Sequence, residues 1–192
     1  MSDTYGSFDE LAAAEPAGAW AITSIDRPTS DVLIIAPHAG RIEPFTTAIA
    51  TAIADQDYSL YCFEGHKPKC NGELHITSHR FEEPVALSLA AQASIVLGIH
   101  GCKGESAIYV GGLDTELVAS LTAALVMDGL PASSTGHRFP AVEPSNICNR
   151  SKRSCGAQLE ITRNLREDAE TRARIVAAAR KSIADKLVAL RS

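Results

Sequence analysis

The sequence predicts an α/β protein with a single mixed, mostly parallel sheet and helices on both faces. Three observations favour this fold class. Residues 32–36, VLIIA, are apolar throughout and rich in β-branched side chains, as in strands that are covered on both faces. Apolar segments of strand length alternate with segments of helical pattern. With 192 residues, 45% of them hydrophobic, the chain suits one domain over residues 1–192.

Capping residues and prolines place the elements of the first half of the chain. Ser7 and Glu10 have the spacing of a capping box, which predicts a short helix. Pro44 and Pro84 each suit the first turn of a helix, where no backbone N–H is needed. In order, we expect a helix at 8–14, an edge strand at 21–25, a strand at 32–36, a helix from 44 to 55, a strand at 58–63, a helix from 84 and a strand at 94–99.

The second half continues the alternation. Asp114 can cap a helix whose apolar positions follow a period of 3.6 residues, and Gly129 is a suitable end for it. A region rich in Pro, Ser, Asn and Arg then indicates a long loop. We therefore expect a strand at 107–112, a helix from 114 to 129, a loop at 131–155, a strand at 157–162 and a helix from 166 to the end.

Composition limits the function classes. The net charge is −5 and the isoelectric point is about 5.7, which argues against broad nucleic-acid binding. No apolar stretch reaches the ~20 residues of a membrane span, and the first residues lack the basic region of a signal peptide. These features predict a cytoplasmic protein with neither a nucleic acid nor a membrane as partner. The five cysteines favour free thiols, although a bridge between Cys148 and Cys155 stays open.

Polar residues follow the predicted strands. His38 and Glu43 come just after one apolar strand, His100 comes just after another, and Glu160 lies inside the strand at 157–162. In open α/β sheets, sites form at the carboxyl ends of strands. Two histidines and a glutamate are a ligand set of hydrolytic zinc, and a further carboxylate can take the proton of a water. Spacing alone leaves an alternative to a metal site: the histidines could be hydrogen-bonded loop residues, and Glu160 could be a surface residue.

Several short motifs occur here in the order found in one family. They are IIAPHAGRIEP, SLYCFEG, LHITS, IHG, YVGGLD, NICNR and QLEIT, and the similarity around them extends from about residue 5 to residue 166. Together they resemble the phage-encoded poly-γ-glutamate hydrolases, whose members are sometimes labelled phage-related replication proteins. The resemblance implies a fold like that of zinc carboxypeptidases. A phage-encoded enzyme of this kind would reach its polymer when the cell lyses.

The resemblance also implies roles for particular residues. His38, Glu43 and His100 look like the ligands of a zinc ion, and Glu160 looks like the general base. His75, in LHITS, is expected to line the cleft. Two departures are visible: this chain has Ala39 and Arg41 where the family has a glycine-richer loop, and the spacing of His38 and Glu43 exceeds the HxxE of carboxypeptidases.

The substrate of such an enzyme carries one carboxylate per residue, so its cleft needs local positive charge. Asn149 and Arg150 form the best candidate clamp, because a guanidinium binds a carboxylate through two parallel hydrogen bonds. Arg163, just after the predicted catalytic strand, is a second candidate, and Arg41 is expected to influence substrate choice.

Three functional hypotheses follow. The first is a zinc-dependent hydrolase that cuts γ-glutamyl amide bonds of poly-γ-glutamate. The second is a related zinc amidase or peptidase that acts on a small acyl-amino acid or peptide, because the same ligands serve any amide. The third is a non-enzymatic phage replication or binding protein, against which the acidic isoelectric point counts.

Overall fold

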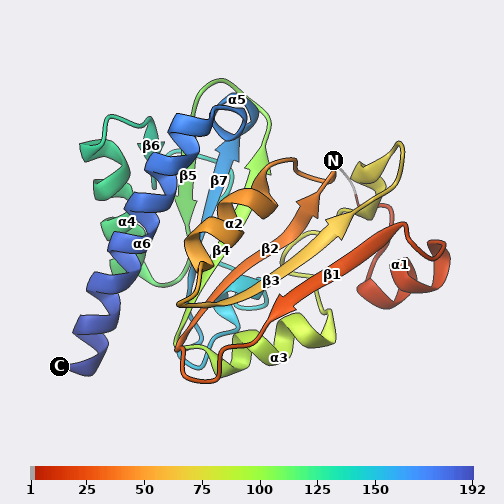
Figure 1. Cartoon of the computed structure of the whole chain (residues 1–192), viewed down its shortest axis with the longest axis horizontal. Coiled ribbons are helices and arrows are strands. Elements are labelled where there is room, and N and C mark those ends of the chain that lie inside the picture. Colours follow the sequence, from red (N-terminus) through yellow and green to blue (C-terminus); the bar gives the residue numbers. More distant parts are fainter. Residues whose placement is uncertain (1–2) are drawn as a thin grey trace.

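The computed structural model describes residues 3–192, and Figure 1 shows one sheet with helices packed against it. Within that range the sheet has seven strands in the order β1-β3-β2-β4-β7-β5-β6. The strands are β1 (Trp20–Ile25), β2 (Val32–Gly40), β3 (Ser59–Gly65), β4 (Ile95–Cys102), β5 (Ile108–Gly111), β6 (Ala132–Ser133) and β7 (Ala157–Thr162).

The pairing of the strands is mixed and mostly parallel, as predicted. β2 lies between β3 and β4 and is parallel to both, and β4 is also parallel to β7. β1 on β3 and β5 on β7 are the antiparallel pairs, while the short β6 is parallel to β5. The arrowheads of β2, β4 and β7 consequently point to the same edge of the sheet (Figure 1).

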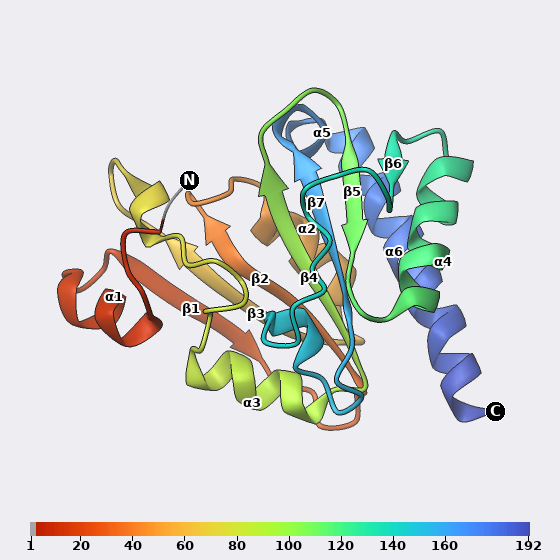
Figure 2. The ribbon, with the colours of Figure 1, turned by 180° about the vertical axis from the view of Figure 1, so that it is seen from behind.

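Helices cover both faces, which confirms the predicted layers. The helices are α1 (Phe8–Ala14), α2 (Thr46–Ala54), α3 (Pro84–Gln92), α4 (Thr115–Met127), α5 (Arg163–Glu167) and α6 (Ala169–Arg191). One apolar cluster joins α2, α4 and α6 to the sheet, and a second joins α1 and α3 to its other face. Figures 1 and 2 show these two groups from opposite sides. None of the helices between residues 3 and 192 is both long and apolar enough to cross a bilayer.

Two strands are longer than the apolar runs that predict them. The run at 32–36 continues to Gly40, with an irregularity in which Ala36 pairs with Cys62 and Ala39 with Glu64. Such a bulge inserts an extra residue and redirects a side chain. His38 therefore lies on the bulged end of β2, and His100 lies within β4 instead of after it.

Three other boundaries differ from expectation. The helix expected from Pro44 begins at Thr46, because Phe45 at its cap has φ 76° and interrupts the helical path. The last helix is divided, since Asp168 is extended and caps α6 by accepting from Thr171 N. The expected loop at 131–155 contains β6 and a short 3-10 helix, η2 (Ile147–Asn149).

Candidate metal centre

A cavity of about 620 Å³ opens at the carboxyl ends of β2, β4 and β7. His38 reaches it from the bulged end of β2, and Glu43 reaches it from the turn before α2. His75 follows a short 3-10 helix, η1 (Asn71–Leu74), in the long connection after β3. Glu160 contributes from β7. This is the place where open α/β sheets build their sites.

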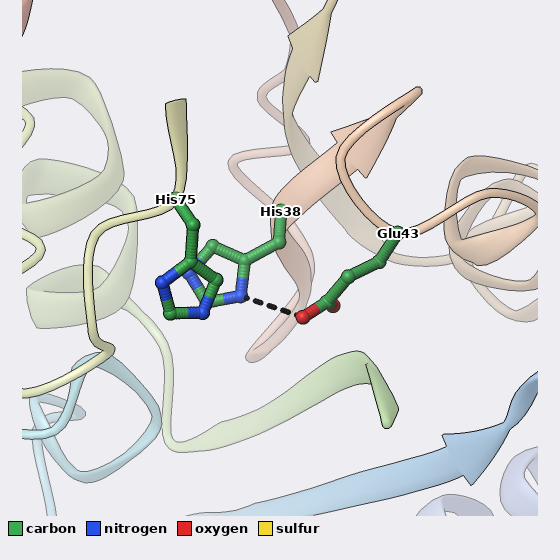
Figure 3. Close-up of side chains that lie close together, drawn as sticks. All are labelled: His38, Glu43 and His75. Carbon is green, nitrogen blue, oxygen red and sulfur yellow. Dashed lines mark ion pairs between the residues drawn. The ribbon is translucent and has the colours of Figure 1, made fainter. Parts of the chain in front are cut away.

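His38, Glu43 and His75 form the compact group of this cavity. Within residues 3–192, one possible ligand atom from each of the three lies within 4.8 Å of the other two. His38 Nδ1 is 3.3 Å from Glu43 Oε1, the pair marked in Figure 3. The rings of His38 and His75 stack, with centroids 4.0 Å apart and 28° between their planes.

The outer nitrogen of each ring is held by an oxygen acceptor. His38 Nε2 lies 2.7 Å from the carbonyl oxygen of Ile76, and His75 Nδ1 lies 2.9 Å from Asp3 Oδ1. These contacts leave His75 Nε2 on the side of the Glu43 carboxylate, together with His38 Nδ1, which lies 3.3 Å from Glu43 Oε1 and 3.2 Å from His100 Nδ1. Two imidazole nitrogens and a carboxylate, with outer hydrogen bonds that fix each ring, fit the donor set of a catalytic zinc site.

His100 lies next to His38 but outside the cavity lining. Its ring is 1% exposed and does not line the cavity, although Nδ1 is 3.2 Å from His38 Nδ1 and 3.9 Å from Glu43 Oε2. Nε2 is buried without a hydrogen-bond partner among the described residues. His100 pairs with Glu160 in the register of β4 and β7, so the two side chains share one face of the sheet.

The three histidines have different pKa values because burial and neighbouring charges act on each of them differently. Burial alone would lower the pKa of His38, but the neighbouring Glu43 carboxylate outweighs burial and raises it. The positive charge of His38, followed by burial, lowers the pKa of His75 to about 4. Burial, followed by the charge of His38, lowers the pKa of His100 to about 3. The Glu43 carboxylate therefore favours the charged form of His38, while His75 and His100 are neutral near pH 7.

Glu160 lines the same cavity as the histidine group. Burial, followed by the negative charge of Glu43, raises the pKa of Glu160 well above its usual range. Its Oε1 accepts a long hydrogen bond of 3.4 Å from Gln158 Nε2. A carboxylate with a raised pKa is a stronger base than an ordinary one, which suits it to accept and return a proton.

Four basic side chains line the cavity: Lys103, Arg138, Arg163 and Arg166. Arg166 is 4% exposed, and its guanidinium lies flat against Gly101, where an added Cβ would be 2.4 Å from Cζ. Its Nε donates to Ile161 O at 2.9 Å, and its Nη1 donates to Pro44 O. The third nitrogen, Nη2, has no hydrogen-bond partner within residues 3–192 and remains for a ligand.

Three of the five residues that the sequence predicts for substrate binding lie outside the cavity. Asn149 is 1% exposed, and its side chain binds the backbone of Leu113, Gly156, Ala141 and Glu143. Arg150 and Arg41 are exposed and do not line the cavity. Arg163 and His75 do line it. Arg138, Arg166 and Asp3 join the site without having been expected from the sequence.

The fold and the site together define a class of protein: an α/β domain with a candidate mononuclear metal centre at the carboxyl edge of its sheet. Comparison with known families then gives the family. The chain belongs to the poly-gamma-glutamate hydrolase family, whose model matches residues 5–187. This confirms the resemblance seen in the sequence motifs and makes the chain a member of a hydrolase family.

Solved structures support the same grouping. The structure of a bacteriophage poly-gamma-glutamate hydrolase superposes with a TM-score of 0.90 at 30% identity, covering 97% of this chain and 99% of that one. A zinc-free, apo form of YndL gives a TM-score of 0.90 at 30% identity, covering 96% and 99%. An N-formylglutamate amidohydrolase from Ralstonia eutropha JMP134 shares the fold alone. Its TM-score is 0.52 at 11% identity, and the match covers 85% of this chain and 96% of that one.

Relatives in Bacillus subtilis (strain 168) are longer than this chain. The UPF0714 protein YndL is 35% identical over 168 residues, which are 86% of this chain and 66% of YndL. The SPbeta prophage-derived UPF0714 protein YoqZ is 36% identical over 172 residues, which are 87% of this chain and 61% of YoqZ. This chain thus spans less than two thirds of the length of either relative.

Proposed function

We propose that this protein is a zinc-dependent hydrolase that cleaves the γ-glutamyl amide bonds of poly-γ-glutamate. The observation that carries the proposal is one cavity that combines His38, Glu43 and His75 with Glu160 and a wall of basic side chains. Family membership supports the substrate class.

In this proposal His38, Glu43 and His75 hold the zinc ion through Nδ1, a carboxylate oxygen and Nε2. The sequence favours His100 as the third ligand, but His75 lines the cavity and has a free nitrogen there, whereas His100 does not line it. His100 then supports the ring of His38 from behind. Zinc at such a site lowers the pKa of a water toward ~7 and polarises the carbonyl that is attacked.

Glu160 serves as the general base. Its carboxylate takes a proton from the attacking water at Oε1 or Oε2 and returns it to the leaving amine. Its place on β7 gives it a rigid backbone, and its raised pKa lets it hold the proton between the two steps. A base on a buried strand is held more accurately than one on a loop.

Arg166 binds charge on the substrate. Two backbone carbonyls fix its guanidinium, so Nη2 is preorganised for a carboxylate or for the oxyanion that forms during attack. Arg138, Arg163 and Lys103 extend the positive wall along the cavity and suit a chain with one carboxylate per residue. Asn149 and Arg150 have no part in the proposed site.

The test is the size of poly-γ-glutamate after incubation with the purified protein, measured by gel filtration. Shortening that stops with a chelator, returns with zinc and is absent in Glu160→Gln is the expected result. An intact polymer in the presence of zinc-loaded protein would contradict the proposed substrate. Cleavage of a short γ-glutamyl amide under those conditions would select the small-substrate amidase instead.

A further inference from the structure

Asp3 makes two hydrogen bonds next to the candidate metal centre. Its Oδ1 is 2.9 Å from Nδ1 of His75, and its Oδ2 accepts from the backbone N–H of Thr77 at 2.9 Å. The side chain of Asp3 is 3% exposed, so its carboxylate is largely shielded from water, whereas the His75 side chain is 27% exposed. The guanidinium of Arg80 is 4.0 Å away and 54% exposed, which makes it a weak partner.

These contacts tie one carboxylate to both histidines of the site. The segment from His75 to Thr77 presents the His75 ring to the cavity, while the carbonyl oxygen of Ile76 holds His38 Nε2. Asp3 binds the first and the last residue of this segment. A shift of the segment would consequently turn both imidazoles.

We propose that Asp3 is a positioning residue of the metal centre. Its carboxylate keeps the His75 proton on Nδ1, so that Nε2 presents its lone pair to the metal, and it holds the segment that orients His38. An imidazole nitrogen can bind a metal only when it carries no proton, and the hydrogen bond of the other nitrogen decides the tautomer. This inference rests on the proposed metal centre.

Other contacts attach the N-terminal segment independently of Asp3. The hydroxyl of Tyr5 donates to Glu15 Oε1 at 2.8 Å, and Phe8 and Leu11 of α1 are buried against the sheet. Removing the Asp3 carboxylate therefore leaves the segment anchored. The effect of Asp3 on the metal can thus be separated from a general attachment of the chain.

Asp3→Asn is the informative variant because asparagine has nearly the same shape. The Thr77 N–H can only donate, so the Asn oxygen must face it, and the Asn NH₂ then faces Nδ1 of His75. That arrangement requires Nδ1 to accept and moves the ring proton to Nε2, where the metal should bind. Tyr5→Phe is the matched control, since it removes a hydrogen bond of the same segment without touching Asp3.

Two measurements test the proposal. The zinc dissociation constant is determined by competition with a chromogenic chelator for the wild type, Asp3→Asn, Asp3→Ala and Tyr5→Phe. The tautomer of His75 is read in the zinc-free protein from long-range ¹H–¹⁵N correlations of labelled histidine, assigned with a His75→Ala sample. We expect about 10- to 100-fold weaker zinc binding in both Asp3 variants, near-wild-type binding in Tyr5→Phe, and an Nε2-protonated His75 in Asp3→Asn.

Unchanged zinc affinity in Asp3→Asn would overturn the proposal, and so would a His75 proton that stays on Nδ1. An equal loss in Tyr5→Phe would overturn it in favour of simple attachment of the segment. A wild-type protein that takes up no zinc would overturn the metal centre itself. The tautomer measurement would then still report whether Asp3 sets the state of His75, so the two failures are distinguishable.

Discussion

The imidazole rings of His38 and His75 stack face to face, with their centroids 4.0 Å apart, and each ring binds an oxygen acceptor outside the pair. The two nitrogens that remain lie beside the carboxylate of Glu43. With both nitrogens unprotonated, the two imidazoles and the carboxylate can offer lone pairs to one cation, which is the physical basis of the proposed zinc site.

The identity of the third ligand can be tested with a matched pair of variants, His75→Gln and His100→Gln. We expect His75→Gln to lose more than about 100-fold in zinc affinity, since losing a ligand should cost more than losing its hydrogen-bond partner. His100→Gln should retain stoichiometric zinc after dialysis, because His100 does not line the cavity. Metal analysis of both proteins checks this. The reverse pattern would assign the ligand to His100, as the strand-end pattern of the sequence indicates.

Glu160→Gln should separate metal binding from turnover. The amide keeps the shape of the side chain but cannot accept the proton of the attacking water. Zinc content should stay at the wild-type level, while kcat should fall by about 10²- to 10⁴-fold. Glu105→Gln, at an exposed position outside the cavity, is the control and should keep full activity. Near-normal turnover in Glu160→Gln would place the base elsewhere.

Local patterns in the sequence predict most of the fold. The β-branched run at 32–36, the capping box at Ser7 and the prolines before two helices are signals within a few residues, and the elements that they predict are present. Element ends depend on more distant partners. β2 continues through Pro37 and His38 because β3 lies beside it as far as Gly40, and nothing in the residues 37–40 themselves indicates this pairing.

The site was only partly predictable for the same reason. His38 lies at the end of β2, Glu43 follows that strand and Glu160 lies near the end of β7, and the topology of a parallel sheet brings such positions together. His75 enters through the connection between β3 and α3, whose path follows no periodic pattern. Its hydrogen-bond partner Asp3 is 72 residues away in the sequence. Arg166 reads as one of many charges in a helical segment, and its burial depends on Gly101 and Pro44 from other elements.

Arg166 is expected to act on substrate binding. In Arg166→Gln, loss of a charge-assisted hydrogen bond of about 1.5–3 kcal/mol should lower kcat/KM for a γ-glutamyl substrate by about 10- to 150-fold. Arg166→Lys should recover little, because an ammonium group cannot reproduce the fixed planar geometry. Steady-state kinetics with Arg150→Ala as control checks this, since Arg150 does not line the cavity. A larger defect in Arg150→Ala than in Arg166→Gln would restore the Asn149–Arg150 clamp.

The acid stability of the fold should depend on Asp114, far from the metal ligands in sequence. Its carboxylate is 2% exposed, accepts from Arg153 at 2.6 Å and Lys186 at 3.0 Å, and caps α4 through Leu117 N. Burial would raise the pKa of Asp114, but the bonds from Arg153 and Lys186 outweigh burial and hold the pKa below its usual range. A carboxylate with a lowered folded-state pKa contributes stability above its unfolded pKa and loses it as the pH falls through the folded value.

Asp114→Asn should therefore cost about 1.5–3 kcal/mol of unfolding free energy at pH 7, because Arg153 and Lys186 lose their buried counter-charge while Glu116 stays 2.6 Å from Lys186 Nζ. The difference from the wild type should shrink as the pH falls below about 4, because Asp114 of the unfolded wild-type chain begins to take up a proton there. Urea denaturation at several pH values measures both. Asp128→Asn is the control, since its exposed pair with Arg174 should be worth less than about 1 kcal/mol. A stability loss in Asp114→Asn that grows toward acid pH would contradict this role of Asp114. A protonated Asp114 should hold Arg153 and Lys186 no more tightly than asparagine does.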